Sequence, residues 1–187
     1  TLGGEPESCF ATVKQDGQRV TRAHVKPGNE GIGPLAGDNI FAQFELADGA
    51  TATFGTQRAV GGRPSRFGLQ IYGSKGIIEI LSGYLPEVWI LQDAAWSPGR
   101  SRKNWRPVTS AGINQPEPLQ LKDPRTAGNV AICRDLIGAI QEDRDPECSV
   151  DEGRWTVEMI AAIFESHRLN APVRFPLENR ANPLARL

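Results

Sequence analysis

The 187-residue sequence contains no long apolar run and few of the residues on which compact catalytic or metal sites depend. No run of about 18 apolar residues or more occurs, which excludes a membrane-spanning helix. Only two histidines and three cysteines are present, without a Cys-x-x-Cys pair, so a zinc ribbon and a disulfide scaffold are both disfavoured. The formal net charge is −1, so no overall field attracts the chain to nucleic acid or to a membrane. We therefore predict no metal site and neither of these partners.

The sequence also begins without a methionine or a charged, signal-like segment. We expect the natural chain to begin upstream of Thr1, and we predict no signal peptide within these residues. The cysteines Cys9, Cys133 and Cys148 lie far apart, and Cys133 falls on an apolar helical face, which predicts a buried free thiol. Free thiols favour a reducing, cytoplasmic compartment, while export of the full-length protein stays open.

Local motifs for nucleophilic catalysis and for nucleotide binding are missing. Gly-x-Ser-x-Gly does not occur. The glycines of Gly28–Gly33 stand in the order G-x-x-G-x-G and open no helix, which argues against dinucleotide binding. The stretch Gly73–Gly76 lacks the spacing of a phosphate-binding P-loop and precedes a β-branched run, so a hairpin turn is favoured. We predict no catalytic and no cofactor-binding residue in this chain.

The two histidines and one basic stretch are the remaining candidates for chemistry. His167 lies beside the apolar stripe of a predicted helix, which favours a hydrogen-bonded, partly buried residue over a catalytic one. His24 precedes a loop rich in glycine and proline and could point into a cleft, although we favour the alternative. The basic residues of Arg100–Arg106 are interpreted as a solvated loop in preference to a phosphate-binding patch.

Apolar and polar residues alternate with period two through the first half of the chain, the pattern of half-buried strands. In residues 40–46, Ile40, Ala42 and Phe44 share one face, and Phe41 and Gln43 share the other. Tight turns containing glycine separate the runs, which predicts an antiparallel meander. The predicted strands are residues 8–14, 40–46, 50–57, 67–72, 77–80, 87–92 and 104–109. Most of residues 93–124 carries little periodicity and is predicted to be a loop or arm.

The last third of the chain changes to helical spacing. A helix over residues 129–142 is predicted to bury Val130, Cys133, Leu136, Ile137 and Ile140. Ser149 with Glu152 three residues later forms a predicted capping box for a second helix that ends near Asn170. Its expected buried residues are Met159, Ile160, Ile163 and Phe164, and Glu158 and Glu165 are expected to point away from them.

These elements predict an α+β fold: an open, mostly antiparallel β-sheet with helices packed on one face, forming a single domain over residues 1–187. About half of the residues on the uncovered face are apolar, including Phe41, Trp89 and Leu91. Because a solvated face needs no such residues, we predict that this face binds a partner.

The order of elements resembles a known family. The segments "GDNIFAQFELADGATATFGT", "RFGLQIYGSKGIIEI", "NVAICRDLIGAIQEDRDPECSVDEGRWTVEMIAAIFES" and "APVRFPLENRANPL" are similar to the C-terminal half of the glucose–fructose oxidoreductase/inositol dehydrogenase (Gfo/Idh/MocA) family. The similarity covers almost the whole chain and is most specific from Asp143 to Ser166.

The resemblance implies an enzyme in two halves. Full-length members have an N-terminal Rossmann domain that binds NAD or NADP, and hydride moves between the nicotinamide and a hydroxyl-bearing carbon of a sugar, cyclitol or related metabolite. This chain then corresponds to the C-terminal domain, which walls the substrate pocket and forms homo-oligomers through its free sheet face. The family's glycine motif, its Glu-Lys-Pro segment and its proton-transferring Asp and His have no counterpart here, so we expect the isolated chain to be inactive and to bind no cofactor.

Residues of this half could still contact a small polyhydroxylated substrate. Lys26 and Asn29 in the long loop after His24 are candidates, and Arg125 and Asn129 at the start of the first helix are others, because such side chains hydrogen-bond to hydroxyl groups. Alternatively, Asn129 only caps its helix, and Lys26 and Arg125 are solvated. A second hypothesis for the whole chain is a non-catalytic binding or assembly module that uses the sheet face for protein association.

Overall fold

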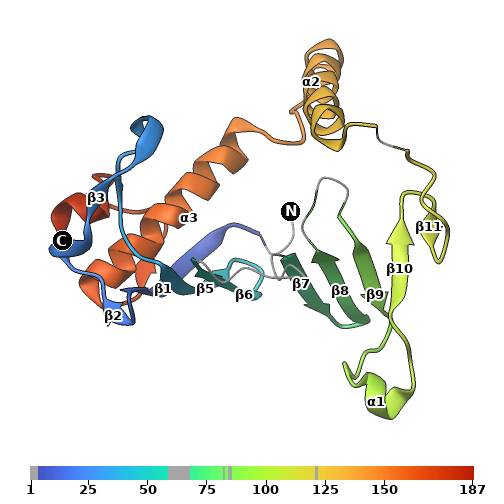
Figure 1. The fold of residues 1–187 in the computed structure, drawn as a ribbon, viewed down its shortest axis with the longest axis horizontal. Coiled ribbons are helices and arrows are strands. Elements are labelled where there is room, and N and C mark those ends of the chain that lie inside the picture. The colour runs from blue at the N-terminus through green and yellow to red at the C-terminus, as the bar shows by residue number, and fades with distance from the viewer. Residues whose placement is uncertain (1–3, 59–67, 82, 84–85, 121) are drawn as a thin grey trace. The chain divides into compact units, whose positions relative to one another are not determined.

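The computed structural model describes residues 4–58, 68–81, 83, 86–120 and 122–187. They form two compact units (Figure 1). The first unit combines residues 1–60 with residues 148–187, and the second comprises residues 61–147. Both ends of the chain therefore belong to the first unit, and the second is an excursion between its two parts.

The first unit is built on an antiparallel sheet of five short strands. Its order is β12 (Val173–Arg174), β1 (Pro6–Gln15), β5 (Asn39–Leu46) and β6 (Thr51–Gln57), and β2 (Gln18–Arg19) pairs with the end of β1. The turn between β5 and β6 contains Gly49 at φ 82°, the positive value that glycine tolerates. The predicted strands and hairpin in this region are confirmed.

One face of this sheet is the core of the first unit. Cys9 pairs with Phe44 and Ala11 with Ala42, and all four side chains are buried on the same face as Val13. The helix α3 (Val150–Leu169) packs across β1 and β12 and adds Ala162 and Ile163 to the cluster. Phe10 and Phe41 point to the opposite face, where they are 46% and 55% exposed. The period-two pattern thus identified the buried face of β5 correctly.

The ends of α3 follow the predicted signals, and Met159, Ile163 and Phe164 of the predicted stripe pack in or against the core, whereas Ile160 and two glutamates differ from the prediction. The Ser149 hydroxyl accepts a hydrogen bond from Glu152 N at 3.3 Å, and Ser149 N donates to Glu152 Oε2 at 2.8 Å, so the capping box is confirmed. The helix ends at Asn170, which has a left-handed conformation. Ile160 is 52% exposed, whereas Glu158 and Glu165 are buried. The prediction for these three residues was wrong, because ion pairs with the C-terminal segment compensate the buried carboxylates.

A two-stranded ribbon projects from the first unit between β2 and β5. It pairs β3 (Lys26–Pro27) with β4 (Pro34–Leu35), and the short 3-10 turns η1 (Arg22–His24) and η2 (Asn29–Gly31) lie before and within it. We call residues 22–35 the arm. At the end of the chain, a third turn, η3 (Pro183–Arg186), packs against β4 and α3.

The second unit holds another antiparallel sheet, in the order β11 (Gly112–Ile113), β10 (Arg106–Thr109), β9 (Val88–Leu91), β8 (Gly76–Leu81) and β7 (Gly68–Gly73). Gly73 pairs with Gly76 across the two-residue turn of Ser74 and Lys75. The hairpin interpretation of this stretch is therefore confirmed. Within the described ranges, the strands form two five-stranded sheets and a ribbon where a single sheet was expected.

The strand register gives the second sheet one aliphatic face. Leu69 pairs with Ile80 and Ile71 with Ile78, all on the same side. The aliphatic residues on this face are Leu69, Ile71, Ile78, Ile80, Val88, Ile90, Val108 and Ile113. Trp89 lies on the other face beside Glu79. Leu91 is fully buried there, so its predicted place on an exposed face was wrong.

The helices of the second unit differ most from the prediction. β10 confirms the strand predicted over residues 104–109, whereas α1 (Pro98–Ser101) and β11 occupy part of the region predicted as a loop. α2 (Pro124–Glu142) begins before Asn129, the predicted start. Its apolar side chains at 130, 136, 137 and 140 are between 39% and 74% exposed, and Cys133 is exposed as well. The predicted burial of this stripe and of the Cys133 thiol was wrong, because helical spacing shows that a helix has an apolar side but not that another element covers it.

Candidate functional site

His167, the strongest candidate for acid–base chemistry by residue type, is a structural residue. It is fully buried. Its Nδ1 accepts a hydrogen bond from Val13 N at 3.1 Å, and Nε2 lies 2.9 Å from Val20 O, so the neutral ring carries its proton on Nε2 and donates it there. Burial, aided by the positive charge of Arg19, lowers the pKa of His167. With both nitrogens engaged, the ring has none free for a substrate, and the prediction of a hydrogen-bonded histidine is confirmed.

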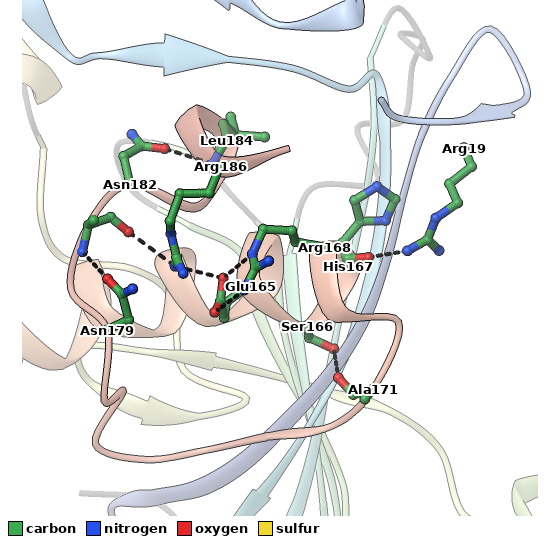
Figure 2. A network of polar contacts seen from close by, with 11 residues as sticks. Arg19, Glu165, Ser166, His167, Arg168, Ala171, Asn179, Asn182, Leu184 and Arg186 are labelled. Carbon is green, nitrogen blue, oxygen red and sulfur yellow. Dashed lines mark hydrogen bonds and ion pairs between the residues drawn. The ribbon is translucent and has the colours of Figure 1, made fainter. Parts of the chain in front are cut away.

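Its neighbours in α3 join the helix to β1 in the same way. Ser166 Oγ accepts a hydrogen bond from Ala11 N at 2.9 Å and donates one to Ala171 O at 2.8 Å. Arg19 from β2 donates to the carbonyl of His167 (Figure 2). It also donates to Asn170 Oδ1 at 3.0 Å. These contacts satisfy backbone groups where the helix ends, a role in stability.

Glu165 is the centre of a second set of polar contacts (Figure 2). Arg168 donates to both of its oxygens at 2.9 Å, and Arg186 Nη2 donates to Oε2 at 2.8 Å. The hydrogen bond from Arg168, with the charges of both arginines, lowers the pKa of Glu165. A carboxyl group held ionised in this way is unsuited to act as a general acid.

Glu158, about two turns earlier on α3, is buried in a similar role. Its Oε1 accepts a hydrogen bond from Leu177 N at 2.7 Å, and Arg180 Nη2 lies 3.5 Å from the same oxygen. The sequence analysis did not predict that Glu158 and Glu165 bind the C-terminal segment to α3 through Leu177 and Arg186. The spacing of Glu165 and Arg168 was a visible signal for an ion pair, but an i,i+3 pair is equally typical of a solvated helix face.

The second unit contains one buried carboxylate that the sequence did not single out. Asp93 accepts hydrogen bonds from Ser101 Oγ at 2.6 Å, Ser97 N at 3.0 Å and Ala95 N at 3.1 Å. The hydrogen bond from Ser101, followed by those from the backbone, lowers the pKa of Asp93. Asp93 therefore builds the turn that leads into α1.

The four predicted substrate-contacting residues fall into two pairs. Lys26 and Asn29 both lie on the arm of the first unit, and both are exposed. Arg125 and Asn129 lie in α2 of the second unit. Asn129 is exposed and stands in the second turn of α2, so the alternative that it caps the helix was wrong. The side chain of Arg125 lies outside the described part of the chain.

His24 is engaged in local structure at the base of the arm. Its Nδ1 accepts a hydrogen bond from Thr21 N at 3.0 Å and closes the turn η1. This contact favours the alternative to a cleft-facing role.

The glycine loop Gly28–Gly33 does not have the geometry of a dinucleotide-binding turn. Gly28–Gly33 closes the ribbon through a hydrogen bond from Gly28 N to Gly33 O at 2.8 Å and opens no helix, whereas a dinucleotide site needs a glycine turn between a strand and a helix. No group of three metal-binding side chains occurs in the part of the chain that the structure covers. Nor is any helix among these residues long and apolar enough to cross a bilayer.

The three cysteines are expected to differ sharply in reactivity. Cys9 is fully buried, and burial raises the pKa of its thiol to about 12, whereas Cys133 and Cys148 are exposed. Because the thiolate is the reactive form, a thiol-specific reagent at neutral pH should add to Cys133 and Cys148 in the folded chain and spare Cys9. Mass spectrometry of the intact protein measures this, and denaturation should expose the third thiol. Rapid modification of Cys9 before unfolding would contradict the packing of β1.

Comparison with known proteins gives one family match. The family model described as the C-terminal alpha/beta domain of an oxidoreductase family, Gfo/Idh/MocA, matches residues 1–175, which include parts of both units. Among curated proteins, none matches the chain.

Solved structures share the fold at low sequence identity. A levoglucosan dehydrogenase in complex with NADH and L-sorbose has a TM-score of 0.63 and 19% identity over 92% of this chain and 45% of its own. An aldose–aldose oxidoreductase from Caulobacter crescentus complexed with glycerol has a TM-score of 0.57 and 19% identity over 92% of this chain and 42% of its own. An Agrobacterium radiobacter oxidoreductase in complex with NAD+, L-tartaric acid and magnesium has a TM-score of 0.58 and 15% identity over 92% of this chain and 44% of its own. The chain thus spans less than half the length of these structures.

Proposed function

The chain belongs to the Gfo/Idh/MocA oxidoreductase family as its C-terminal alpha/beta domain, and from this premise we propose that it is the substrate-side domain of an NAD(P)-dependent enzyme that acts on a sugar, cyclitol or related metabolite. The observation that carries the proposal is the family match over residues 1–175. It confirms the resemblance seen in the sequence, and the antiparallel sheets with their helices confirm the α+β class. The names of the similar structures support a polyhydroxylated substrate and a nicotinamide cofactor.

The proposed division of labour follows from what the chain provides. Hydride and proton transfer require donor, acceptor and base within about 3–3.5 Å in one geometry. The glycine loop Gly28–Gly33 opens no α-helix, and the buried His167, Glu158 and Glu165 are hydrogen-bonded within the first unit. We therefore assign the cofactor site and the proton-transferring groups to a separate N-terminal Rossmann domain. The role of this chain is to shape the substrate pocket, and Lys26, Asn29, Arg125 and Asn129 are its proposed contacts to substrate hydroxyl groups.

The test is a nicotinamide-linked assay of the complete natural protein against a panel of sugars and cyclitols, with NAD and with NADP. We expect turnover with at least one substrate and none from the 187-residue chain alone. In the active protein, Lys26→Ala should raise KM about tenfold, because a hydrogen bond to a charged group contributes roughly 1.5–3 kcal/mol. Lys103→Ala, which removes a basic residue near α1, is the matched control and should leave KM unchanged. Turnover by the isolated chain would refute the division of labour.

Association through a sheet face is a second proposed role, and exposed apolar residues on both sheets favour it. Phe10 and Phe41 lie on neighbouring strands of the first sheet, and the second sheet has its aliphatic face. We propose that copies of the protein form homo-oligomers through such a face. A stand-alone assembly module would share this property but would show no turnover in the complete natural protein.

Light scattering after size-exclusion chromatography tests the association. We expect a dimer or larger species, and Phe41→Glu should shift it toward the monomer because a charge would then be buried in the interface. Ile160→Glu is the matched control, since Ile160 is 52% exposed but lies on α3 rather than on the open sheet face. A wild-type chain that stays monomeric at high concentration would contradict the proposal.

A further inference from the structure

No residue of the arm is buried, and its internal structure is limited to the β3–β4 pairing and the two short turns η1 and η2. Residues that flank the arm are bonded to β1: Val20 N donates to Val13 O at 3.1 Å, and Asp38 N donates to Lys14 O at 2.9 Å. Within the arm, Gly28 N donates to Gly33 O at 2.8 Å, and its apolar Ile32 is 64% exposed. A segment with so little burial opens easily unless another element supports it.

The C-terminal segment, residues 177–187, supplies such support. Arg22 Nη1 donates to Leu184 O at 3.0 Å, and η3 packs against β4. Asn182 Nδ2 lies 3.5 Å from the position that a Cβ on Gly33 would take. Pro183 and Leu184 of η3 are buried. Figure 1 shows the C-terminus beside the ribbon that contains β3.

The segment is itself fastened to α3 by the two buried glutamates. Glu158 Oε1 accepts from Leu177 N at 2.7 Å, and Glu165 Oε2 accepts from Arg186 Nη2 at 2.8 Å. Arg168 holds Glu165 in place through two hydrogen bonds (Figure 2). Loss of Arg186 would leave the buried carboxylate of Glu165 with one fewer partner and would destabilise the folded protein. A continuous series of contacts therefore runs from α3 through η3 to the arm.

We propose that the C-terminal segment is a clamp that orients the arm, so that Glu165, Arg186 and Arg22 are positioning residues for Lys26 and Asn29. The proposal has two parts: the segment orders the arm, and the ordered arm binds substrate better. The second part rests on the substrate-side function proposed above. The first part, the ordering of the arm, depends only on contacts within the first unit. Residues 176–187 lie beyond the family match, so the clamp is not part of that match.

Hydrogen exchange of the 187-residue chain tests the ordering of the arm. In Arg22→Ala, the amides of Gly28 and Ile32 should exchange about tenfold faster or more, the change expected when one hydrogen bond to a charged group is lost. Arg186→Ala should have the same effect, and Arg186→Lys should restore part of the protection. The amides of Ala11 and Val13, which are bonded to Ser166 and His167, should be unchanged and show that the core is intact.

The matched control is Arg144→Ala, which removes an arginine with ion pairs of 2.9 and 2.7 Å to Asp135 and Glu142 in the second unit. It should leave exchange in the arm unchanged. If Arg22→Ala leaves the arm amides as protected as in the wild type while the core amides are intact, the clamp is refuted. Arg22 is exposed, and its replacement leaves both buried glutamates paired, so Arg22→Ala should fold. The test therefore remains valid even if Arg186→Ala does not fold.

A double-mutant cycle in the active, complete protein tests the effect on substrate. Arg22→Ala and Lys26→Ala should each raise KM with little change in kcat, and the double variant should be no worse than Lys26→Ala, because a misplaced lysine and an absent one lose the same contact. Multiplicative effects on KM would overturn the positioning role even if exchange in the arm increases. Absence of turnover in the wild type would instead refute the proposed function and leave the exchange result standing.

Discussion

Replacement of His167 by leucine should destabilise the first unit by roughly 2–6 kcal/mol, because the backbone groups of Val13 and Val20 both lose a buried hydrogen-bond partner, each loss costing about 1–3 kcal/mol. The leucine side chain has a similar volume, so the change mainly removes the two polar contacts. The expected result is a large fall in the urea concentration at which the unit unfolds, measured by circular dichroism.

His24→Leu is the matched control for this prediction. The His24 ring is partly exposed, and its Nδ1 accepts a hydrogen bond from Thr21 N, three residues earlier. We expect a change of about 1 kcal/mol or less, since water can replace the lost partner. Equal stability of His167→Leu and wild type would show that the two buried backbone groups find other partners.

The same histidine should make stability depend on pH. Because burial lowers its pKa in the folded protein, the unfolded chain binds a proton at a higher pH than the folded chain does. Its contribution is therefore fully present above the ordinary histidine pKa and is lost as the pH falls through the lowered folded value. Unfolding free energies measured across this acidic range should fall less steeply in His167→Leu than in the wild type.

Gly76→Ala should disrupt the β7–β8 hairpin and lower the free energy of unfolding of the second unit by at least about 4 kcal/mol. Single substitutions have effects of this size when they cause severe steric clashes or leave buried polar groups without partners. A Cβ at this position would lie 1.9 Å from Leu91 O and 3.0 Å from Asp93 N. Both are backbone atoms that cannot turn aside as a side chain would. Gly76 also has φ 149°, a conformation that residues with a side chain rarely adopt.

Gly73→Ala provides the matched control in the same hairpin. Its added Cβ would have as its nearest contact Gly76 O at 3.7 Å, an ordinary van der Waals distance. Tryptophan fluorescence can follow the second unit, because Trp89, Trp96 and Trp105 lie there and only Trp155 lies in the first. We expect Gly76→Ala to lower the unfolding midpoint strongly and Gly73→Ala to change it little. Similar effects of the two substitutions would contradict the register of β8 and β9.

Features that depend on neighbouring residues could be predicted from the sequence. The alternation of Ala42 and Phe44 with Phe41 identifies the two faces of β5, because successive side chains of a strand point to opposite sides. Ser149 and Glu152 mark the start of α3, because a capping box is formed by residues three apart. These local signals, with the family resemblance, were sufficient for the fold class.

Features that depend on distant contacts could not be predicted. Glu158 and Glu165 have the composition of a solvated helix face, and contacts with the distant residues Leu177 and Arg186 help to make their burial favourable. Cys133 has the spacing of a core residue, yet α2 leaves it exposed. In each case the environment of the residue is set by segments far away in the chain.

The sequence by itself determined the order and type of most elements, the turns that join them and the resemblance to one oxidoreductase family, because each depends on backbone preferences and side-chain spacing over a few residues. Only the tertiary structure decided which charged residues are buried, and it revealed the contacts through which the C-terminal segment meets the arm at Arg22 and Leu184. The physical reason is that a charge is buried favourably only where a partner is brought to it, and that partner is supplied by the fold rather than by the neighbouring sequence.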